Sequence, residues 1–473
     1  MSLLLDSTFE KIKQYLESEV KSNAVVEYLS PKELSAAFDF SLGKSHNTQE
    51  ILEYIDSYLK YAVKTGNPQF LNQLFQGKIS EALAGDMLAV ATNSSMYTYE
   101  VSPLATMMEM ELVKKMNTFS GFKNGDGTFS TGGSNSNLLG LLCGRYNHNP
   151  KLKSSGLFGQ KPMTMFVSEK AHYSFQKAAF TLGLGTENLI RVKTDNAHRI
   201  IPAELEKAIV KAIENGKDPF FIAATAGTTE FGAFDPIDEM ADIAKKYNCW
   251  FHVDGSWGGS IILSNNHRHL FNGIHKSDSF SWNAHKLMNV PLIASIFLVK
   301  DPVVLHNALS SSETEYIFHE NENESCDLGV KSLQCGKRND ALKLWLAWKA
   351  IGDEAYDQKI NALMGLAQSI TNKIEAEPDL ELLAPTQSLN INFRYCGKLP
   401  EGDLNKFNVE LRNKLWHQGK TMVNYCHLGE TISIRLVLAN LNLTKADLDK
   451  FLQHFLTTAK ALENERTLVN SNG

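Results

Sequence analysis

The middle of the chain alternates short apolar runs with amphipathic helical patterns, and this alternation limits the possible folds more than any other feature. Apolar runs fall at Thr164–Ser168, Phe220–Ala224 and Trp250–Val253. The helical patterns between them open on Pro202 and Pro236, residues that suit the first turn of a helix. Strands separated by helices of this length form βαβ units, so the sequence predicts a parallel sheet covered by helices.

Polar side chains stand where these predicted strands end. His172 follows the first strand, Thr225 follows the second, and Asp254 follows the third. Parallel sheets bind ligands at the carboxyl ends of their strands, so we expect these side chains to line one site. Simpler interpretations remain open, because a lone histidine is often structural and a Gly/Thr segment is often only a turn.

A lysine further along the chain gives this expected site a chemistry. The segment Ser281-Trp-Asn-Ala-His-Lys286 ends in an amine and lies downstream of the carboxylate of Asp254. Most lysines are solvated surface residues. Pyridoxal phosphate (PLP), however, requires both an amine that forms a Schiff base and an acid that keeps the pyridine nitrogen protonated. The pair Lys286 and Asp254 therefore indicates PLP as the cofactor.

A loop rich in glycine and hydroxyl groups could hold the phosphate of such a cofactor. Ser130–Asn137 precedes the apolar helical run Leu138–Arg145. Hydroxyls and free N–H groups at the start of a helix bind phosphate, although a simple loop with capping residues explains the pattern equally well. The spacing matches neither a Walker loop nor a dinucleotide-binding fingerprint.

Arg435 is an unusual residue in the apolar run Thr431–Val437. A buried arginine needs a partner. It either binds a carboxylate of a ligand through two hydrogen bonds or forms a structural ion pair, and both interpretations stay open. The pair His267 and His269 lacks further ligands for a metal ion, so we expect no metal site.

Composition narrows the class of protein. The chain has 473 residues, of which 43% are hydrophobic, and a net charge of −6, which argues against a nucleic-acid partner. Six scattered cysteines without a CxxC motif indicate reduced thiols and a cytoplasmic protein. No apolar run approaches the ~20 residues of a membrane span.

The pattern of elements changes near residue 340, and the chain is expected to divide into three parts. We predict an N-terminal helical arm at residues 1–66, a large α/β domain with a mainly parallel sheet at 67–340, and a smaller α+β domain at 341–473. The polar tail Glu463–Gly473 is expected to lie outside the last helix.

Taken together, these segments resemble the group II PLP-dependent amino acid decarboxylases, in the branch of glutamate decarboxylase and cysteine sulfinate decarboxylase. The resemblance runs from about Asn67 to Phe455. It implies the PLP-dependent transferase fold type I, a homodimer with active sites at the subunit interface, and α-decarboxylation of an acidic amino acid. The motifs that carry it are Tyr97–Glu100, Gly132–Ser136, Ser168–Tyr173, Ala224–Pro236, His252–Asp254, Trp257–Gly259, His267–His269, Asn283–Lys286 and Gln334–Gly336.

The resemblance also implies roles for single residues around the cofactor. Lys286 would bind PLP covalently, Asp254 would pair with the pyridine nitrogen, and His172 would stack on the ring and direct protonation. Thr225 would approach the cofactor or the substrate, and Ser256, which stands where the family commonly has alanine, would face the ring. The phosphate would be held by Ser134, Asn135, Ser136, Asn283 and His285.

The same resemblance bears on the substrate. Gln73 and Arg435 would contact its distal acidic group. Phe75, Tyr97 and Ser134 are similar to the cysteine sulfinate branch, and the bulk of Phe75 should shorten the pocket in favour of cysteine sulfinate or aspartate. Glutamate remains possible, because one methylene group changes discrimination by only ~1–3 kcal/mol.

The resemblance fails in the loop between Tyr316 and Leu333, which in the family carries a tyrosine that protonates the substrate carbon. No tyrosine occupies that place here, and we hypothesise that His319 or His172 supplies the proton. Two alternatives therefore stay open. One is a PLP enzyme with another outcome, such as aldehyde formation or action on a non-acidic amino acid, and the other is a non-catalytic dimeric relative.

Overall fold

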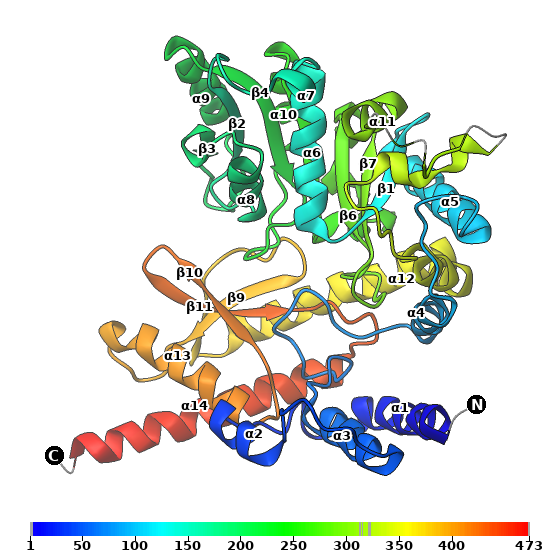
Figure 1. Cartoon of the computed structure of the whole chain (residues 1–473). Helices are drawn as coiled ribbons and strands as arrows, with labels where there is room; N and C mark the ends of the chain where they lie inside the picture. The colour runs from blue at the N-terminus through cyan, green and yellow to red at the C-terminus, as the bar shows by residue number, and fades with distance from the viewer. Residues whose placement is uncertain (1–2, 312–313, 315, 320–322, 472–473) are drawn as a thin grey trace. The chain divides into compact units, whose positions relative to one another are not determined.

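The computed structural model describes residues 3–311, 314, 316–319 and 323–471, and the chain forms two compact units (Figure 1). The smaller unit contains residues 1–77, 366–385 and 390–473. The larger unit contains residues 78–365 and 386–389. The division into residues 1–66, 67–340 and 341–473 stays a prediction.

The larger unit is built on a seven-stranded sheet in which only one strand opposes the others. The strand order is β1-β7-β6-β5-β4-β2-β3, and β7 runs antiparallel to both of its neighbours. The pairs among β2 to β6 are all parallel, which confirms the predicted α/β fold with a mainly parallel sheet. The strands are β1 (Asp126–Ser130), β2 (Met163–Ser168), β3 (Leu189–Val192), β4 (Asp218–Thr225), β5 (Trp250–Gly255), β6 (Ser279–Asn283) and β7 (Ser295–Val299).

The central strands are buried along almost their whole length, as expected for strands covered on both faces. Among the helices that pack on the sheet, α6 lies against β4 to β7, while α9 and α10 lie against β4. The helices of this unit are α4 (Ser80–Thr92), α5 (Pro103–Ser120), α6 (Gly133–His148), α7 (Leu152–Ser155), α8 (Ser174–Thr181), α9 (Pro202–Glu214), α10 (Ile237–Lys246) and α11 (Pro302–Leu309).

Four strands of this sheet, β1, β3, β6 and β7, were not predicted from the sequence, and in two of them polar residues are the reason. β6 has the sequence Ser-Phe-Ser-Trp-Asn, and β1 has the sequence Asp-Gly-Thr-Phe-Ser. Their polar residues break up the apolar runs that identify buried strands. Inside the sheet these residues find hydrogen-bond partners. Ser279, for example, accepts a hydrogen bond from the indole N–H of Trp250 at 2.8 Å.

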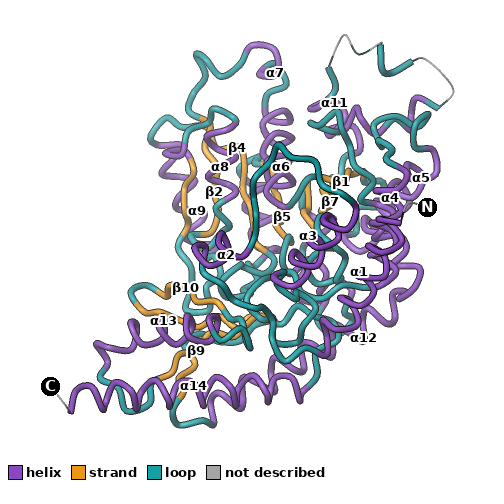
Figure 2. Tube along the Cα trace, turned by 60° about the horizontal axis from the view of Figure 1, so that its bottom comes forward, coloured by secondary structure: helices purple, strands orange, loops and turns teal. Residues whose placement is uncertain are grey.

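The smaller unit contains an antiparallel sheet in the order β10-β11-β9-β8. Its strands are β8 (Leu380–Leu382), β9 (Asn390–Tyr395), β10 (Asn424–Leu428) and β11 (Thr431–Val437). Its helices, seen in purple in Figure 2, include α1 (Leu3–Lys21), α2 (Pro31–Ala37), α3 (Thr48–Tyr61), α13 (Glu401–His417) and α14 (Lys445–Ser471).

The long helices show both a correct and a wrong prediction. Thr444 and Asp447 form a reciprocal cap at the start of α14, with the Thr444 N–H donating to Asp447 at 3.0 Å and the Asp447 N–H donating to Thr444 at 3.3 Å. The tail prediction was wrong, because α14 continues to Ser471. α12 (Ala341–Ala376) breaks at Gly352, whose φ is 73°. Within the described part of the chain, no helix is long and apolar enough to cross a membrane.

Candidate active site

The carboxyl ends of the parallel strands bring several predicted site residues to one edge of the sheet. Thr225 is the direct neighbour of Asp254 across β4 and β5, and Asp254 is the neighbour of Ser281 across β5 and β6. Asn283 ends β6, and Lys286 lies in the turn that follows. The Lys286 N–H donates to the Asn283 carbonyl at 3.2 Å. Chain segments that are far apart in the sequence therefore meet at this edge.

Asp254 is 3% exposed, yet it is held as a carboxylate. Its Oδ1 accepts a hydrogen bond from the backbone N–H of Ser256 at 2.9 Å, and its Oδ2 accepts one from Asn137 Nδ2 at 2.8 Å. Burial alone would raise the pKa of Asp254, but the hydrogen bond from Ser256, the neighbouring His252 and the hydrogen bond from Asn137 together lower it. This edge of the sheet therefore contains a fixed, buried negative charge.

His172 lies near this charge and is half-buried. Its Nδ1 accepts a hydrogen bond from the Ser174 N–H at 3.2 Å. Burial lowers the pKa of His172, while the Asp254 carboxylate opposes the shift and the Lys286 ammonium adds to it. The imidazole is therefore neutral at neutral pH, with the side chains of Asp254 and Lys286 close enough to influence it.

The amino end of α6 meets the same region through a chain of hydroxyl groups. Ser136 Oγ lies 2.7 Å from Ser130 Oγ and 3.0 Å from Ser295 Oγ. Ser295 in turn donates to Asn283 Oδ1 at 2.6 Å. These contacts fix the start of α6 against β1, β6 and β7. Of the other predicted phosphate ligands, Ser134 is exposed and Asn135 is half-buried.

His285 is placed by the segment that precedes β7. Its Nδ1 accepts a hydrogen bond from the Ala294 N–H at 3.1 Å, which leaves the ring proton on Nε2, and the side chain is 7% exposed. Burial lowers the pKa of His285 to about 3. The imidazole is therefore neutral, so it could bind a phosphate oxygen only as a hydrogen-bond donor and not as a cation.

The polar groups at this edge fit PLP. A Cβ added to Gly133 would lie 2.6 Å from Ser256 Oγ and 2.7 Å from Asn283 Nδ2, so only glycine leaves the space in front of both groups open. Thr225 Oγ1 and Ser256 Oγ are buried without a hydrogen-bond partner among the described residues. Such atoms are costly unless a ligand satisfies them. Donors at a helix start, an amine and a buried acid complete what this cofactor requires.

Three residues at the site were missed by sequence reasoning. Asn137 and His252 form hydrogen bonds behind Asp254, and Asp235 holds Thr225 in place. Asp235 accepts hydrogen bonds from the N–H groups of Thr225 and Ile200, both at 2.7 Å, and burial raises its pKa to about 7. His252 could have been found from spacing alone, because residues i and i+2 of a strand share a face.

The predicted substrate residues are divided between the two units. Gln73, Phe75 and Arg435 lie in the smaller unit, where Arg435 Nη2 donates to the Asn72 carbonyl at 3.1 Å. The Val437 N–H donates to the Leu71 carbonyl at 3.1 Å, so the segment at residues 71–76 begins beside the end of β11. The structure thus places Arg435 against the backbone of the segment that carries Gln73 and Phe75.

Tyr97 lies in the larger unit, beside the loop that departs from the family pattern. Its ring stacks on Phe318 with 5.1 Å between centroids, and its carbonyl accepts a hydrogen bond from the Gly329 N–H at 2.8 Å. His319 is exposed and lines a pocket of about 540 Å³ with residues 98–100. Residues 320–322 of the loop lie outside the described residues, so the hypothesis for His319 or His172 stays a prediction.

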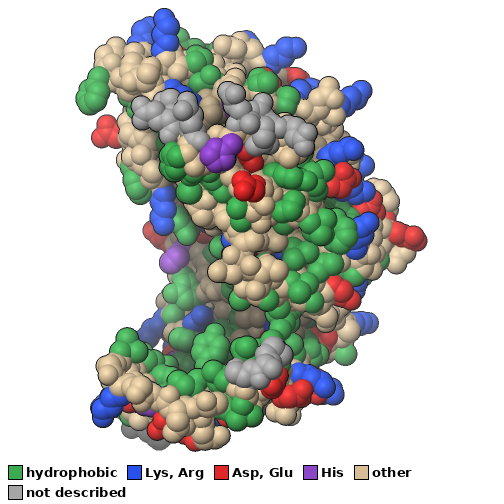
Figure 3. Space-filling view, turned by 45° about the vertical axis from the view of Figure 1, so that its right-hand side comes forward, with side chains coloured by type: hydrophobic (Ala, Val, Ile, Leu, Met, Phe, Trp, Pro, Cys, Tyr) green, Lys and Arg blue, Asp and Glu red, His purple; other side chains and the backbone are tan. Residues whose placement is uncertain are grey.

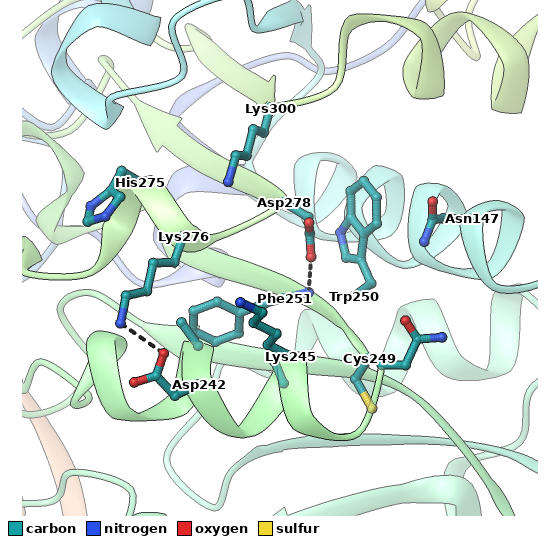
Figure 4. Close-up of a pocket in the computed structure, with 13 residues that line it drawn as sticks. Asn147, Asp242, Lys245, Cys249, Trp250, Phe251, His275, Lys276, Asp278 and Lys300 are labelled. Carbon is teal, nitrogen blue, oxygen red and sulfur yellow. Dashed lines mark hydrogen bonds and ion pairs between the residues drawn. The ribbon is translucent and has the colours of Figure 1, made fainter.

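A separate pocket of about 450 Å³ lies at the opposite edge of the sheet, where β5 and β6 begin (Figure 4). Figure 4 shows lysine and aspartate side chains around it, including Lys276 bonded to Asp242 at 2.8 Å. None of the sequence-predicted site residues lines this pocket. At the other edge, the buried carboxylate, the lysine and the polar groups at the start of α6 together fit one class of protein, a PLP-dependent enzyme.

The chain belongs to the pyridoxal-dependent decarboxylases. Residues 31–396 match the family model described as the pyridoxal-dependent decarboxylase conserved domain. PLP is the cofactor, and the protein is a PLP-dependent amino acid decarboxylase. This result confirms the family and the fold type that the motifs predicted.

Individual relatives match nearly the whole chain. Cysteine sulfinic acid decarboxylase of Mus musculus is 37% identical and covers 92% of this chain and 91% of its own length. Acidic amino acid decarboxylase GADL1 of Homo sapiens is 37% identical and covers 90% and 84%. The crystal structure of mouse CSAD in its apo form superposes with a TM-score of 0.93 at 36% identity, covering 96% of this chain and 98% of that one.

The crowded space at Gly133 generates a prediction. Gly133→Ala would place a methyl group against Ser256 Oγ and Asn283 Nδ2. Overpacking of this kind costs about 1–3 kcal/mol, so we expect the affinity for PLP to fall about 5- to 150-fold. Fluorescence titration of the apoenzyme with PLP measures this affinity. The control is Gly365→Ala, a helical position where an added Cβ meets nothing within 4 Å. Equal PLP affinities for both variants would contradict the prediction.

Proposed function

We propose that this enzyme removes the α-carboxyl group of a small acidic amino acid as CO₂, with cysteine sulfinate or aspartate favoured and glutamate possible. The observation that carries the proposal is Arg435, a cation that is 8% exposed and stands beside the segment at residues 71–76. A buried guanidinium is suited to an acidic group. The names of the two relatives described above, which refer to cysteine sulfinic acid and to acidic amino acids, support the same substrate class.

The residues at the strand ends have separate tasks in this reaction. When bound, PLP supplies an electron-accepting ring for the electron pair left as CO₂ departs. Lys286 holds the cofactor through its amine, and Asp254 holds a proton on the pyridine nitrogen. Neutral His172 would stack on the ring and direct a proton to the substrate carbon. The phosphate would be held by Ser134, Asn135, Ser136, Asn283 and His285, and Thr225 and Ser256 would face the ring.

A second set of residues is assigned to the substrate. Arg435 and Gln73 bind its distal acidic group, Phe75 limits its length, and Tyr97 is a further substrate contact. The ring of Phe75 packs against Phe70 with 6.1 Å between centroids, so it has a fixed support. A rigid aromatic ring in this place excludes a longer substrate better than a mobile side chain would.

We also propose that the enzyme is a homodimer in the cytoplasm. Helices α4 and α5 expose six apolar side chains, and Figure 3 shows hydrophobic side chains gathered on a face of the molecule. Contiguous apolar surface of this kind is typical of an interface with a second copy. No disulfide joins any of the six cysteines, all of which lie in the described part of the chain, and this agrees with a reducing compartment. The exposed residues are Met87, Leu88, Val90, Leu104, Met107 and Met110.

The covalent role of Lys286 is tested by Lys286→Ala. We expect release of CO₂ from cysteine sulfinate, aspartate and glutamate to fall by at least about 10³-fold, the scale on which removal of a covalent catalyst acts. Borohydride reduction followed by peptide mass spectrometry should place the PLP label on Lys286 in the unsubstituted enzyme. Lys300→Ala, in the pocket at the opposite edge of the sheet, is the matched control. Wild-type turnover by Lys286→Ala would refute the proposed function.

The role of Phe75 in specificity is tested by Phe75→Ala. A longer pocket should raise kcat/KM for glutamate relative to cysteine sulfinate by about 10-fold, since one methylene is worth ~1–3 kcal/mol. Competition assays with both amino acids measure this ratio, and product analysis separates amine from aldehyde. Phe40→Ala, an exposed aromatic residue of the same unit, should leave the ratio unchanged. A ratio that does not move in Phe75→Ala would exclude a steric role for this ring.

The dimer is tested by placing a charge on the apolar face. Leu104→Glu and Met107→Glu change side chains of α5 that are 69% and 48% exposed, so neither should disturb the fold of one chain. A charge at an apolar interface is costly, and light scattering after gel filtration should therefore report monomers. Val303→Glu on α11, 56% exposed, is the control. Dimers that persist in both α5 variants would show that this face is not the interface.

A further inference from the structure

A continuous chain of hydrogen bonds connects the interior of the sheet to Asp254. Trp250 Nε1 lies 2.8 Å from Ser279 Oγ, and Ser279 Oγ lies 2.9 Å from His252 Nδ1. His252 Nε2 lies 3.0 Å from Asn137 Oδ1, and Asn137 Nδ2 lies 2.8 Å from Asp254 Oδ2. Every one of these side chains is at most 5% exposed, so water cannot replace a lost partner.

The direction of the hydrogen bonds follows from the chemistry of the two ends. An indole N–H only donates, so Ser279 Oγ accepts from Trp250 and has one proton left, which it donates to His252 Nδ1. Burial lowers the pKa of His252, so the ring is neutral and its single proton lies on Nε2. That proton is donated to Asn137 Oδ1.

The Asp254 end requires the same direction. If the His252 proton lay on Nδ1, Asn137 would have to turn its NH₂ group toward His252 and its oxygen toward Asp254. Two acceptors would then face each other at 2.8 Å in the interior. In the observed order, Asn137 donates to both Asp254 Oδ2 and Ser174 Oγ, and Ser281 Oγ donates to Asn137 Oδ1 at 3.2 Å.

We propose that Asn137 and His252 are positioning residues that hold Asp254 as an anion of fixed orientation and thereby keep the pyridine nitrogen of PLP protonated. This inference rests on the proposed pairing of Asp254 with that nitrogen. Asn137 acts by donating to the carboxylate, and His252 acts through Asn137 by fixing its amide orientation. Loss of either residue frees Asp254 Oδ2 to take up the proton that belongs on the cofactor.

The packing of α6 makes this chain of hydrogen bonds from Trp250 to Asp254, called the relay below, possible. Asn137 follows Gly133 by one helical turn, so one helix supplies both the amino end beside Asn283 and the amide beside Asp254. A Cβ on Gly140 would lie 3.0 Å from His252 Nδ1, and only glycine lets the helix approach the imidazole without pressing on it.

Four substitutions test the relay. Asn137→Leu keeps the volume but removes the donor, and His252→Phe removes the group that orients Asn137. His252→Gln keeps a donor near the Nε2 position and should therefore restore the orientation of the Asn137 amide. Ser260→Ala is the matched control, because it also deprives a buried tryptophan N–H (Trp282 Nε1, 2.8 Å) of its acceptor without reaching Asp254.

The readout is the ¹⁵N chemical shift of the pyridine nitrogen in holoenzyme reconstituted with ¹⁵N-labelled PLP. We expect the protonated signal in wild type, His252→Gln and Ser260→Ala, and a shift toward the unprotonated signal in Asn137→Leu and, less strongly, in His252→Phe. We expect kcat to fall about 10- to 100-fold in Asn137→Leu and His252→Phe, which is the scale of one charge-assisted hydrogen bond.

Asp254→Asn separates this inference from the proposed function. If Asp254→Asn keeps the protonated signal, the proposed pairing with the cofactor is wrong. If Asp254→Asn loses it while Asn137→Leu and His252→Phe keep it, or if Ser260→Ala loses it equally, the relay is wrong. Should Asn137→Leu not fold, the comparison of His252→Phe with His252→Gln decides, because both retain Asn137.

Discussion

A charged carboxylate inside a protein persists only where fixed donors reach both of its oxygens, and the catalytic edge of this enzyme is arranged around that requirement for Asp254. One donor, the Ser256 N–H, comes from the turn after β5. The other, Asn137, comes from α6. The second donor forces α6 to lie directly on the sheet, where glycines at positions 140 and 144 allow it to touch His252 and Trp250. The same close packing delivers the amino end of α6 to Asn283, so one helix positions both the buried acid and the groups proposed to bind the phosphate.

Much of this arrangement could be predicted from the sequence because it depends on local pattern. The apolar runs of β2, β4 and β5, separated by helices that open on proline, indicated the parallel sheet. The rule that ligands bind at carboxyl ends of parallel strands then selected Thr225, Asp254 and the segment to Lys286. The strands β1 and β6 were missed because serine and threonine occupy interior positions there, and only the tertiary structure supplies their partners.

Other features depend on contacts that no local pattern contains. Arg435 bonds to the carbonyl of Asn72, a residue 363 positions away, and either of its two sequence interpretations was consistent with the chain alone. Asn137 looked like the last residue of a phosphate loop, and its role beside Asp254 becomes visible only when α6 lies on β5. The polar tail looked unstructured because it lacks an apolar run, yet it extends α14, whose helix already starts with a reciprocal cap.

The direction of β7 has a consequence of its own. Because it opposes its neighbours, β7 contributes its first residue, Ser295, where the adjacent strands contribute their last. The stretch between Lys286 and Ser295 is therefore anchored at both ends within the catalytic edge, through Asn283 on one side and Ala294 on the other. The residues between these two anchors belong to no strand, so the pairing of β6 with β7 does not by itself set their number. The register of the sheet and the length of this connection are therefore two separate constraints on the catalytic edge.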